Sequence, residues 1–152
     1  MAKLTKDQVR DLILSAKEDK GITWDEIGKK LGRTSVGAAV ICYGYGQVDD
    51  DKEVDTIISL FGLPPEAKRA LKAAPHRKPV QPWPPTDPFI YRFYEVVMLY
   101  GPVWKDVCHE IFGDGIISAI DCFFDISKVI DDAGIARAKF VFQGKWLKYL
   151  KY

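Results

Sequence analysis

The first half of the chain mixes apolar and polar positions in short segments, and each segment carries a helix-start or helix-stop signal. Thr5 with Gln8 and Thr23 with Glu26 have the spacing of capping boxes, which satisfy free backbone amides at the start of a helix. Glycines follow the segments and favour the left-handed turn that ends a helix. We therefore predict a five-helix bundle over residues 1–74. Its expected helices cover residues 6–19, 24–31, 36–43, 52–61 and 66–74.

A proline-rich stretch interrupts this pattern over residues 75–88. It contains six of the nine prolines in the chain. Proline fixes φ and has no amide hydrogen, so such a stretch suits neither a helix nor a central strand. We predict an extended linker between two domains.

After the linker the positions become mostly apolar. Asp87 is a helix cap, and Pro88 stands at the first helical position of a segment that runs to Gly101. Pro102 then restarts a second helix that ends at Gly113. The sequence thus predicts two consecutive helices in this region.

Beyond these helices, β-branched and aromatic residues predict short strands separated by turn residues. The expected strands cover residues 116–126, 135–142 and 145–150. The predicted fold class is α+β, with a five-helix bundle followed by two helices and short strands. The predicted domains are a helical bundle at 1–74, the linker at 75–88, and a catalytic and dimerisation domain at 89–152.

The composition of the chain excludes few classes of protein function. The chain has 152 residues with a net charge of +1, so its overall charge gives no reason to expect nucleic acid or an anionic membrane as partner. The start of the chain has no apolar signal-peptide segment, and no apolar run is long enough to span a bilayer. The three cysteines, Cys42, Cys108 and Cys122, form no paired motif. We therefore expect reduced thiols in a cytoplasmic protein.

Residues 22–44 have the spacing of a helix-turn-helix motif, which in a DNA-binding protein places its second helix against the bases. The stretch 34–48, which contains that second helix, has no Lys, Arg, Asp or Glu. A helix so apolar suits packing against protein, and we expect no DNA binding. The alternative function is a transcriptional regulator with a C-terminal dimerisation domain, and a third is a purely structural oligomerisation module.

Arg92 and Glu95 are three residues apart and so share one face of a helix. Their neighbours are aromatic and aliphatic, which predicts a helix buried in a core or an interface. A buried arginine needs an anionic partner. The spacing slightly favours Glu95 as that partner over a bound anion, and both remain open.

Ser118 lies in an apolar run that follows a Gly-Asp-Gly turn. It is not part of a Gly-x-Ser-x-Gly motif, and neither His76 nor His109 is placed as an obvious base for it. It is either a hydrogen-bonded strand hydroxyl or a donor for an anion. Cys108 and His109 are adjacent and point in different directions on a helix, and no zinc-binding set is apparent.

Two long motifs, "DPFIYRFYE" at 87–95 and "FGDGIISAI" at 112–120, closely resemble those of the cyanases, and the resemblance extends over nearly the whole chain. It implies bicarbonate-dependent decomposition of cyanate to ammonia and carbon dioxide through carbamate, in detoxification or nitrogen metabolism. It also implies a catalytic triad of Arg92, Glu95 and Ser118. No metal or cofactor is expected, and bicarbonate is a co-substrate. Arg92 and Ser118 would bind the anions, while Glu95 would orient Arg92 or assist a proton step.

The resemblance further implies a homo-oligomer, a decamer built from five intertwined dimers with active sites between dimers. Two features depart from the family pattern. Asp121 stands where a neutral amide is expected, and the C-terminal segment 145–152 is more basic than usual. Neither departure affects the triad.

Overall fold

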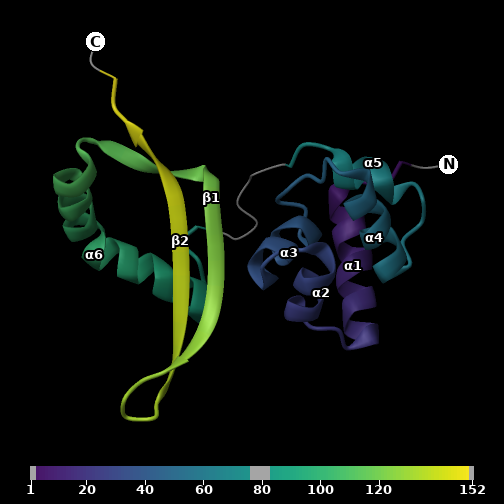
Figure 1. Ribbon diagram of the computed structural model, residues 1–152, viewed down its shortest axis with the longest axis horizontal. Coiled ribbons are helices and arrows are strands. Elements are labelled where there is room, and N and C mark those ends of the chain that lie inside the picture. The colour runs from purple at the N-terminus through teal and green to yellow at the C-terminus, as the bar shows by residue number, and fades with distance from the viewer. Residues whose placement is uncertain (1–2, 76–82, 151–152) are drawn as a thin grey trace. The chain divides into compact units, whose positions relative to one another are not determined.

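The computed structural model describes residues 3–75 and 83–150, and its backbone contacts divide the chain into two compact units. One unit joins residues 1–77 to 123–142, and the other joins residues 78–122 to 143–152. Within these described ranges, six helices precede two strands, in the order that Figure 1 shows, which confirms the predicted α+β class. Half of the predicted linker, residues 76–82, lies outside the described residues, and so does His76. The division into three segments expected from the sequence stays a prediction.

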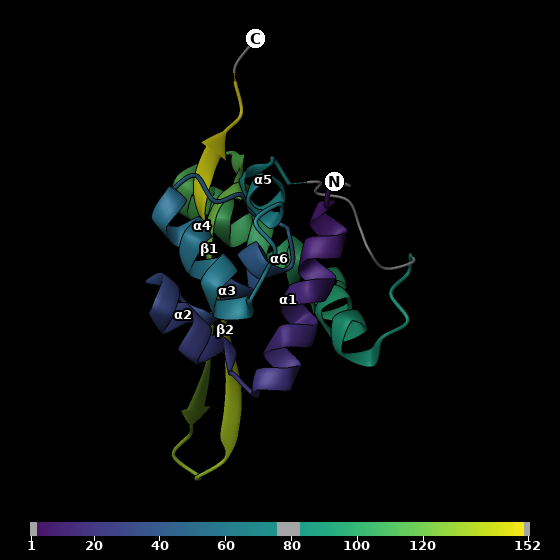
Figure 2. The same cartoon turned by 90° about the vertical axis from the view of Figure 1, so that its right-hand side faces the viewer.

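Five short helices pack together, as Figures 1 and 2 show from two sides, and confirm the predicted bundle. The oxygens of Thr5 and Thr23 accept the amide hydrogens of Gln8 and Glu26, and both return bonds of the two capping boxes are present. Gly62, one of the predicted stop residues, has φ of 66°. The helices are α1 (Lys6–Lys20), α2 (Trp24–Leu31), α3 (Ser35–Cys42), α4 (Asp51–Phe61) and α5 (Ala67–Lys72).

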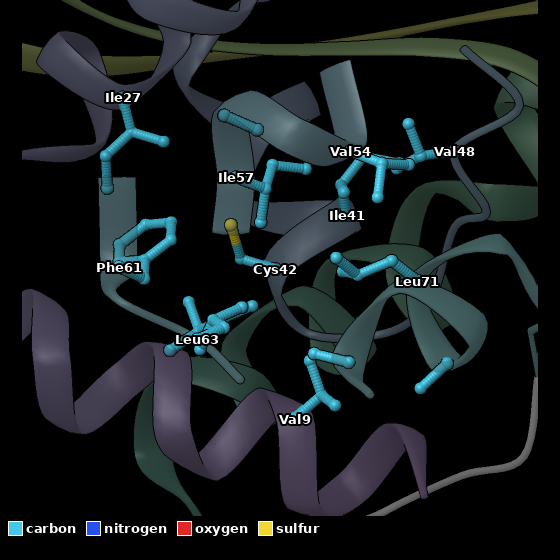
Figure 3. Packing of buried hydrophobic residues seen from close by; sticks show 14 residues of the cluster. Val9, Ile27, Ile41, Cys42, Val48, Val54, Ile57, Phe61, Leu63 and Leu71 are labelled. Carbon is cyan, nitrogen blue, oxygen red and sulfur yellow. The ribbon is translucent and has the colours of Figure 1, made fainter. Parts of the chain in front are cut away.

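The bundle has its own hydrophobic core, part of which is seen in Figure 3. Every buried apolar side chain of the described chain lies between Val9 and Leu71. Ile13, Ile27 and Ile57 are fully buried and come from three different helices. The bundle can therefore bury its apolar faces without help from the rest of the chain.

The C-terminal half contains one helix where the sequence predicted two. Helix α6 (Pro88–Phe112) is continuous over 25 residues and has Pro102 in its interior. Proline removes one helical hydrogen bond, and it usually also clashes with the Cβ of the preceding residue. Here the preceding residue is Gly101, which has no Cβ, so the helix passes through this point. None of the described helices, α6 included, is long and apolar enough to cross a membrane.

Strand β1 (Gly115–Ile130) and strand β2 (Ala136–Lys148) pair in a two-stranded sheet. They have 16 and 13 residues, so the prediction of short strands is wrong. The predicted break at Gln143–Gly144 is also wrong, because both residues lie inside β2. The turn between the strands is organised by Asp131, whose Oδ1 accepts the amide hydrogens of Ala133 and Ile135.

Candidate active site

The first half of α6 presents Arg92 and Glu95 on one face, as their spacing predicted. Arg92 Nη1 donates to Glu95 Oε2 at 2.5 Å, so the glutamate is a direct partner of the arginine. The start of the helix is fixed by Asp87, whose Oδ1 accepts the Ile90 amide at 2.9 Å. This cap places Arg92 and Glu95 in the first two turns of a well-anchored helix.

Aromatic rings lie next to this pair. Tyr94 contacts Trp83 edge to face with ring centroids 4.7 Å apart, and Tyr91 lies 6.1 Å from Tyr94. The Arg92 side chain is nevertheless 73% exposed, and α6 has no buried residue. The sequence predicted that this helix is buried in a core or an interface. The described chain does not supply a core for it, which leaves the interface.

The ion pair leaves most of the arginine's hydrogen-bonding capacity unused. A guanidinium has five N–H donors in a planar fork, and only one nitrogen, Nη1, is bonded to Glu95. The remaining donors suit a planar or linear oxyanion. Glu95 holds the guanidinium in place and also cancels part of its charge, so the electrostatic attraction for an anion depends on further donors.

Ser118 in β1 is such a donor. Its exposed fraction is only 6%, and among the described residues it is the one polar residue that is buried. Its Oγ accepts the amide hydrogens of Ile120 at 3.1 Å and Asp121 at 2.9 Å. A hydroxyl has two acceptor lone pairs and one hydrogen, so both lone pairs are occupied and the hydrogen remains to be donated. The backbone thus sets Ser118 up as a hydrogen-bond donor.

The residue pattern around Ser118 did not predict these two amides as its partners. Serine hydroxyls often bond to backbone groups two or three residues away, and this tendency was the available signal. In a regular strand the amides of consecutive residues point to opposite edges, so a hydroxyl that accepts both of them marks a local irregularity, which the residue pattern does not reveal.

Asp121, one of the two departures that the resemblance suggested, has a cationic neighbour across the sheet. Its Oδ2 lies 4.0 Å from Lys145 Nζ, and both side chains are largely exposed. The extra negative charge near Ser118 is therefore partly balanced by β2. Exposed pairs of this kind contribute little to stability, but they do affect the local potential.

His109 connects the end of α6 to the start of β1. Its Nε2 lies 3.0 Å from the Gly115 carbonyl oxygen, and its Nδ1 lies 3.2 Å from Asp114 Oδ1. Trp146 packs edge-on against the imidazole at 6.0 Å. Both ring nitrogens are thus occupied by neighbours other than Ser118, in agreement with the expectation that His109 is not its base.

Within the described residues, no hydrogen bond or ion pair joins the Arg92–Glu95 pair to Ser118. One chain therefore fixes each of these groups separately without connecting them. The described residues also contain no group of three or more His, Cys, Asp or Glu side chains arranged to hold a metal ion. The assignment of the three residues as catalytic stays a prediction.

Comparison with known proteins gives consistent matches. The cyanate lyase C-terminal domain matches residues 82–151. A cyanate hydratase from Sulfurisphaera tokodaii is 53% identical over 98% of this chain and 99% of its own length. One from Aquifex aeolicus is 49% identical over 92% of this chain and 93% of its own length. The crystal structure of cyanase from T. urticae superimposes with a TM-score of 0.79 at 31% identity, over 92% of this chain and 96% of that one.

Proposed function

This chain belongs to the cyanate hydratase family, whose members are also called cyanate lyases or cyanases, and from that membership we infer how it acts. It is a lyase that decomposes cyanate. The observation that carries this conclusion is the 53% identity to a cyanate hydratase over nearly the full length of both chains. The finer features of the reaction and of the assembly are proposals.

We propose that bicarbonate is the second substrate. Its oxygen would attack the cyanate carbon, and loss of carbon dioxide from the adduct would leave carbamate, which breaks down to ammonia and a second carbon dioxide. Balance of atoms and charge then requires that one cyanate, one bicarbonate and two protons yield one ammonia and two carbon dioxides. Each turnover should therefore make an unbuffered solution more alkaline.

The three candidate residues have complementary roles in this proposal. Arg92 would supply positive charge and a planar set of donors to one anion, and Glu95 would hold the guanidinium in its orientation. Ser118 would donate its free hydrogen to an anion oxygen, because its lone pairs accept backbone amides. Fixed donors in a water-poor site stabilise developing negative charge strongly.

No protein nucleophile, metal or cofactor is needed in this scheme, since bicarbonate itself provides the attacking oxygen. The enzyme has to bring two anions together and offset their repulsion. The occupied lone pairs of Ser118 support this proposal, because they leave its oxygen poorly suited to nucleophilic attack.

The apolar surface of α6 supports assembly with further copies of the chain. The helix has no buried residue, and its apolar side chains Val97, Met98 and Leu99 are all more than half exposed. A helix that is apolar on most faces needs a partner surface. We propose the family arrangement, a decamer of five dimers with active sites between dimers, in the cytoplasm, where Cys42, Cys108 and Cys122 would stay free thiols.

The transcriptional regulator is not favoured. The full-length relatives are cyanate hydratases, and α3, the second helix of the helix-turn-helix-like pair, contains no charged residue. The absence of DNA binding stays a prediction.

The direct test is ammonia release from cyanate, measured with added bicarbonate and in buffer from which bicarbonate and carbon dioxide have been removed. We expect release that depends on bicarbonate. Equal rates in the depleted buffer would contradict the two-anion mechanism, and no ammonia under either condition would contradict the assigned activity.

A further inference from the structure

Strand β2 comes unusually close to the backbone of Ser118 at Gly144. A Cβ atom added to Gly144 would lie 2.3 Å from the Ser118 carbonyl oxygen and 2.7 Å from Ile117 Cγ1. Real Cβ atoms essentially never come within 3.0 Å of a neighbour. Unlike Gly134 in the hairpin turn, Gly144 does not have a positive φ. Its backbone conformation is therefore open to any residue, and the need for glycine comes from lack of space.

We propose that Gly144 is a positioning residue for Ser118, which rests on the proposed role of Ser118 in binding the reacting anions. The bare Cα of Gly144 lets β2 support the Ser118 backbone at close range. The Ser118 hydroxyl is held by the amides of Ile120 and Asp121. The serine is thus fixed between its own strand and the neighbouring strand.

The geometry sets a lower limit to the displacement that a methyl group would cause. Moving the Ser118 oxygen from 2.3 Å to the shortest observed separation of 3.0 Å requires 3.0 − 2.3 = 0.7 Å. The Ile117 side chain can turn away because it is partly exposed, but the Ser118 carbonyl is backbone and cannot. A misplacement of about 1 Å in a catalytic constellation can reduce turnover on the order of a hundredfold.

A matched control is available in the same pair of strands. A Cβ at Gly115 would lie 2.5 Å from the Leu147 carbonyl oxygen and 2.7 Å from Trp146 Nε1, an overlap of similar severity that does not involve Ser118. Gly115 also lacks a positive φ. Gly115→Ala therefore reports what the same steric strain does to stability and assembly.

The experiment compares Gly144→Ala, Gly115→Ala, Ser118→Ala and the unchanged enzyme. For each, kcat and KM for cyanate, oligomer mass and the denaturation midpoint are measured. We expect Gly144→Ala to assemble with a kcat reduced by at least about tenfold, and Gly115→Ala to lose similar stability with kcat within about threefold of the unchanged enzyme. Hydrogen exchange of the amides in residues 116–124 should accelerate in Gly144→Ala, because the hydroxyl that accepts two of them is displaced.

A fourth variant separates the two overlaps at Gly144. Adding Ile117→Ala to Gly144→Ala removes the side-chain overlap but leaves the one with the Ser118 carbonyl. We expect the double variant to remain as slow as Gly144→Ala, and recovery of normal kcat would contradict the inference.

The remaining outcomes are also informative. If Gly144→Ala has a normal kcat, or a kcat no lower than that of Gly115→Ala, the inference about Gly144 is wrong. If Ser118→Ala is inactive in the same experiment, the proposed role of Ser118 still stands. Failure of Gly144→Ala to assemble would assign the glycine to folding and also overturn the inference about Gly144. A fully active Ser118→Ala would instead show that the proposed role of Ser118 is wrong.

Discussion

Ser118 and Arg92 are proposed to serve the same reaction, yet their surroundings in one chain differ sharply. The serine is 6% exposed and is held by two backbone amides, whereas the arginine side chain is 73% exposed and pairs, within the described residues, with Glu95 alone. The hydroxyl is therefore oriented by the fold of a single chain. The guanidinium needs neighbouring surfaces before it can act in a water-poor site.

The shape of the Arg92 side chain should matter as much as its charge. Lysine keeps the positive charge but offers a single ammonium in place of the planar fork. We expect Arg92→Lys to reduce kcat/KM for cyanate about a hundredfold, the scale of losing one preorganised donor, and Arg92→Leu to have no measurable activity. Steady-state ammonia release measures both values.

Arg33 provides the control for that substitution. It also forms an ion pair with a glutamate, using Nε and Nη2 toward the two carboxylate oxygens of Glu53, but it lies in the helical bundle. Arg33→Lys should leave kcat/KM unchanged. Near-normal activity of Arg92→Lys would show that the donor geometry of Arg92 is unimportant.

Cys42 gives a pH-dependent prediction for the bundle. Burial raises the pKa of this thiol from 9.0 to about 12, because the thiolate would be desolvated in the core. The folded state thus keeps a proton that the unfolded chain releases above pH 9. The contribution of this group to stability is complete below pH 9 and is lost as the pH rises toward about 12.

Urea unfolding of the unchanged protein and of Cys42→Ala, at equal protein concentration, measures this loss. Between pH 8 and pH 10 the free energy of unfolding should fall by about 1.4 kcal/mol more in the unchanged protein, and most of this fall should come above pH 9, where the thiol of the unfolded chain is mainly ionised. Other titrating groups are common to both proteins and cancel. Identical pH dependence would show that the Cys42 thiol is not protected from ionisation.

At the scale of elements, helices α1 to α5 were predictable because their signals are local. A capping box requires only two residues at a fixed spacing, and both predicted boxes are formed. The helix-turn-helix-like pair and its uncharged second helix were likewise evident from the sequence.

Helix α6 and strand β2 were not predicted correctly, because glycine and proline have different effects in different surroundings. Gly101 and Pro102 look like a helix end, yet the missing Cβ of the glycine lets the helix continue past the proline. Gly144 looks like a strand break, yet it is a strand residue that lacks room for a side chain. The sequence does not show which backbone lies opposite, so it could not separate these possibilities.

The candidate site, like the fold, was predictable from the sequence where its contacts are local. The spacing of Arg92 and Glu95 predicted their pairing, which the structure contains. The amides that hold Ser118 depend on an irregular stretch of strand, and the residue pattern carries little information about it. Local chemistry was thus visible in the sequence, and contacts between strands were not.

At the scale of the whole molecule, apolar surface is distributed very unevenly. All but two of the large apolar side chains that are exposed in the described chain come from residue 83 onward, the exceptions being Leu12 and Tyr43. The bundle has a complete core, whereas α6 and the hairpin leave Phe89, Ile111 and Ile120 more than 60% exposed. Surfaces this apolar are typical of interfaces between subunits.

The proposed location of the sites between dimers leads to the central claim of the proposal, that Arg92 of one chain and Ser118 of another complete a cyanate site. A mixed-oligomer experiment tests this claim most directly. Arg92→Leu and Ser118→Ala are prepared separately, and each should be inactive alone. They are then unfolded together in equal amounts and refolded, and the mass of the mixed oligomers is measured along with their ammonia release.

With random mixing, half the chains carry an intact Arg92 and half carry an intact Ser118, so a site shared by two chains of a symmetric oligomer is intact in about a quarter of cases. We predict that the mixture recovers roughly that fraction of the normal activity. Mixed oligomers of full size that remain as inactive as either parent would show that both residues act within one chain and would contradict the shared site.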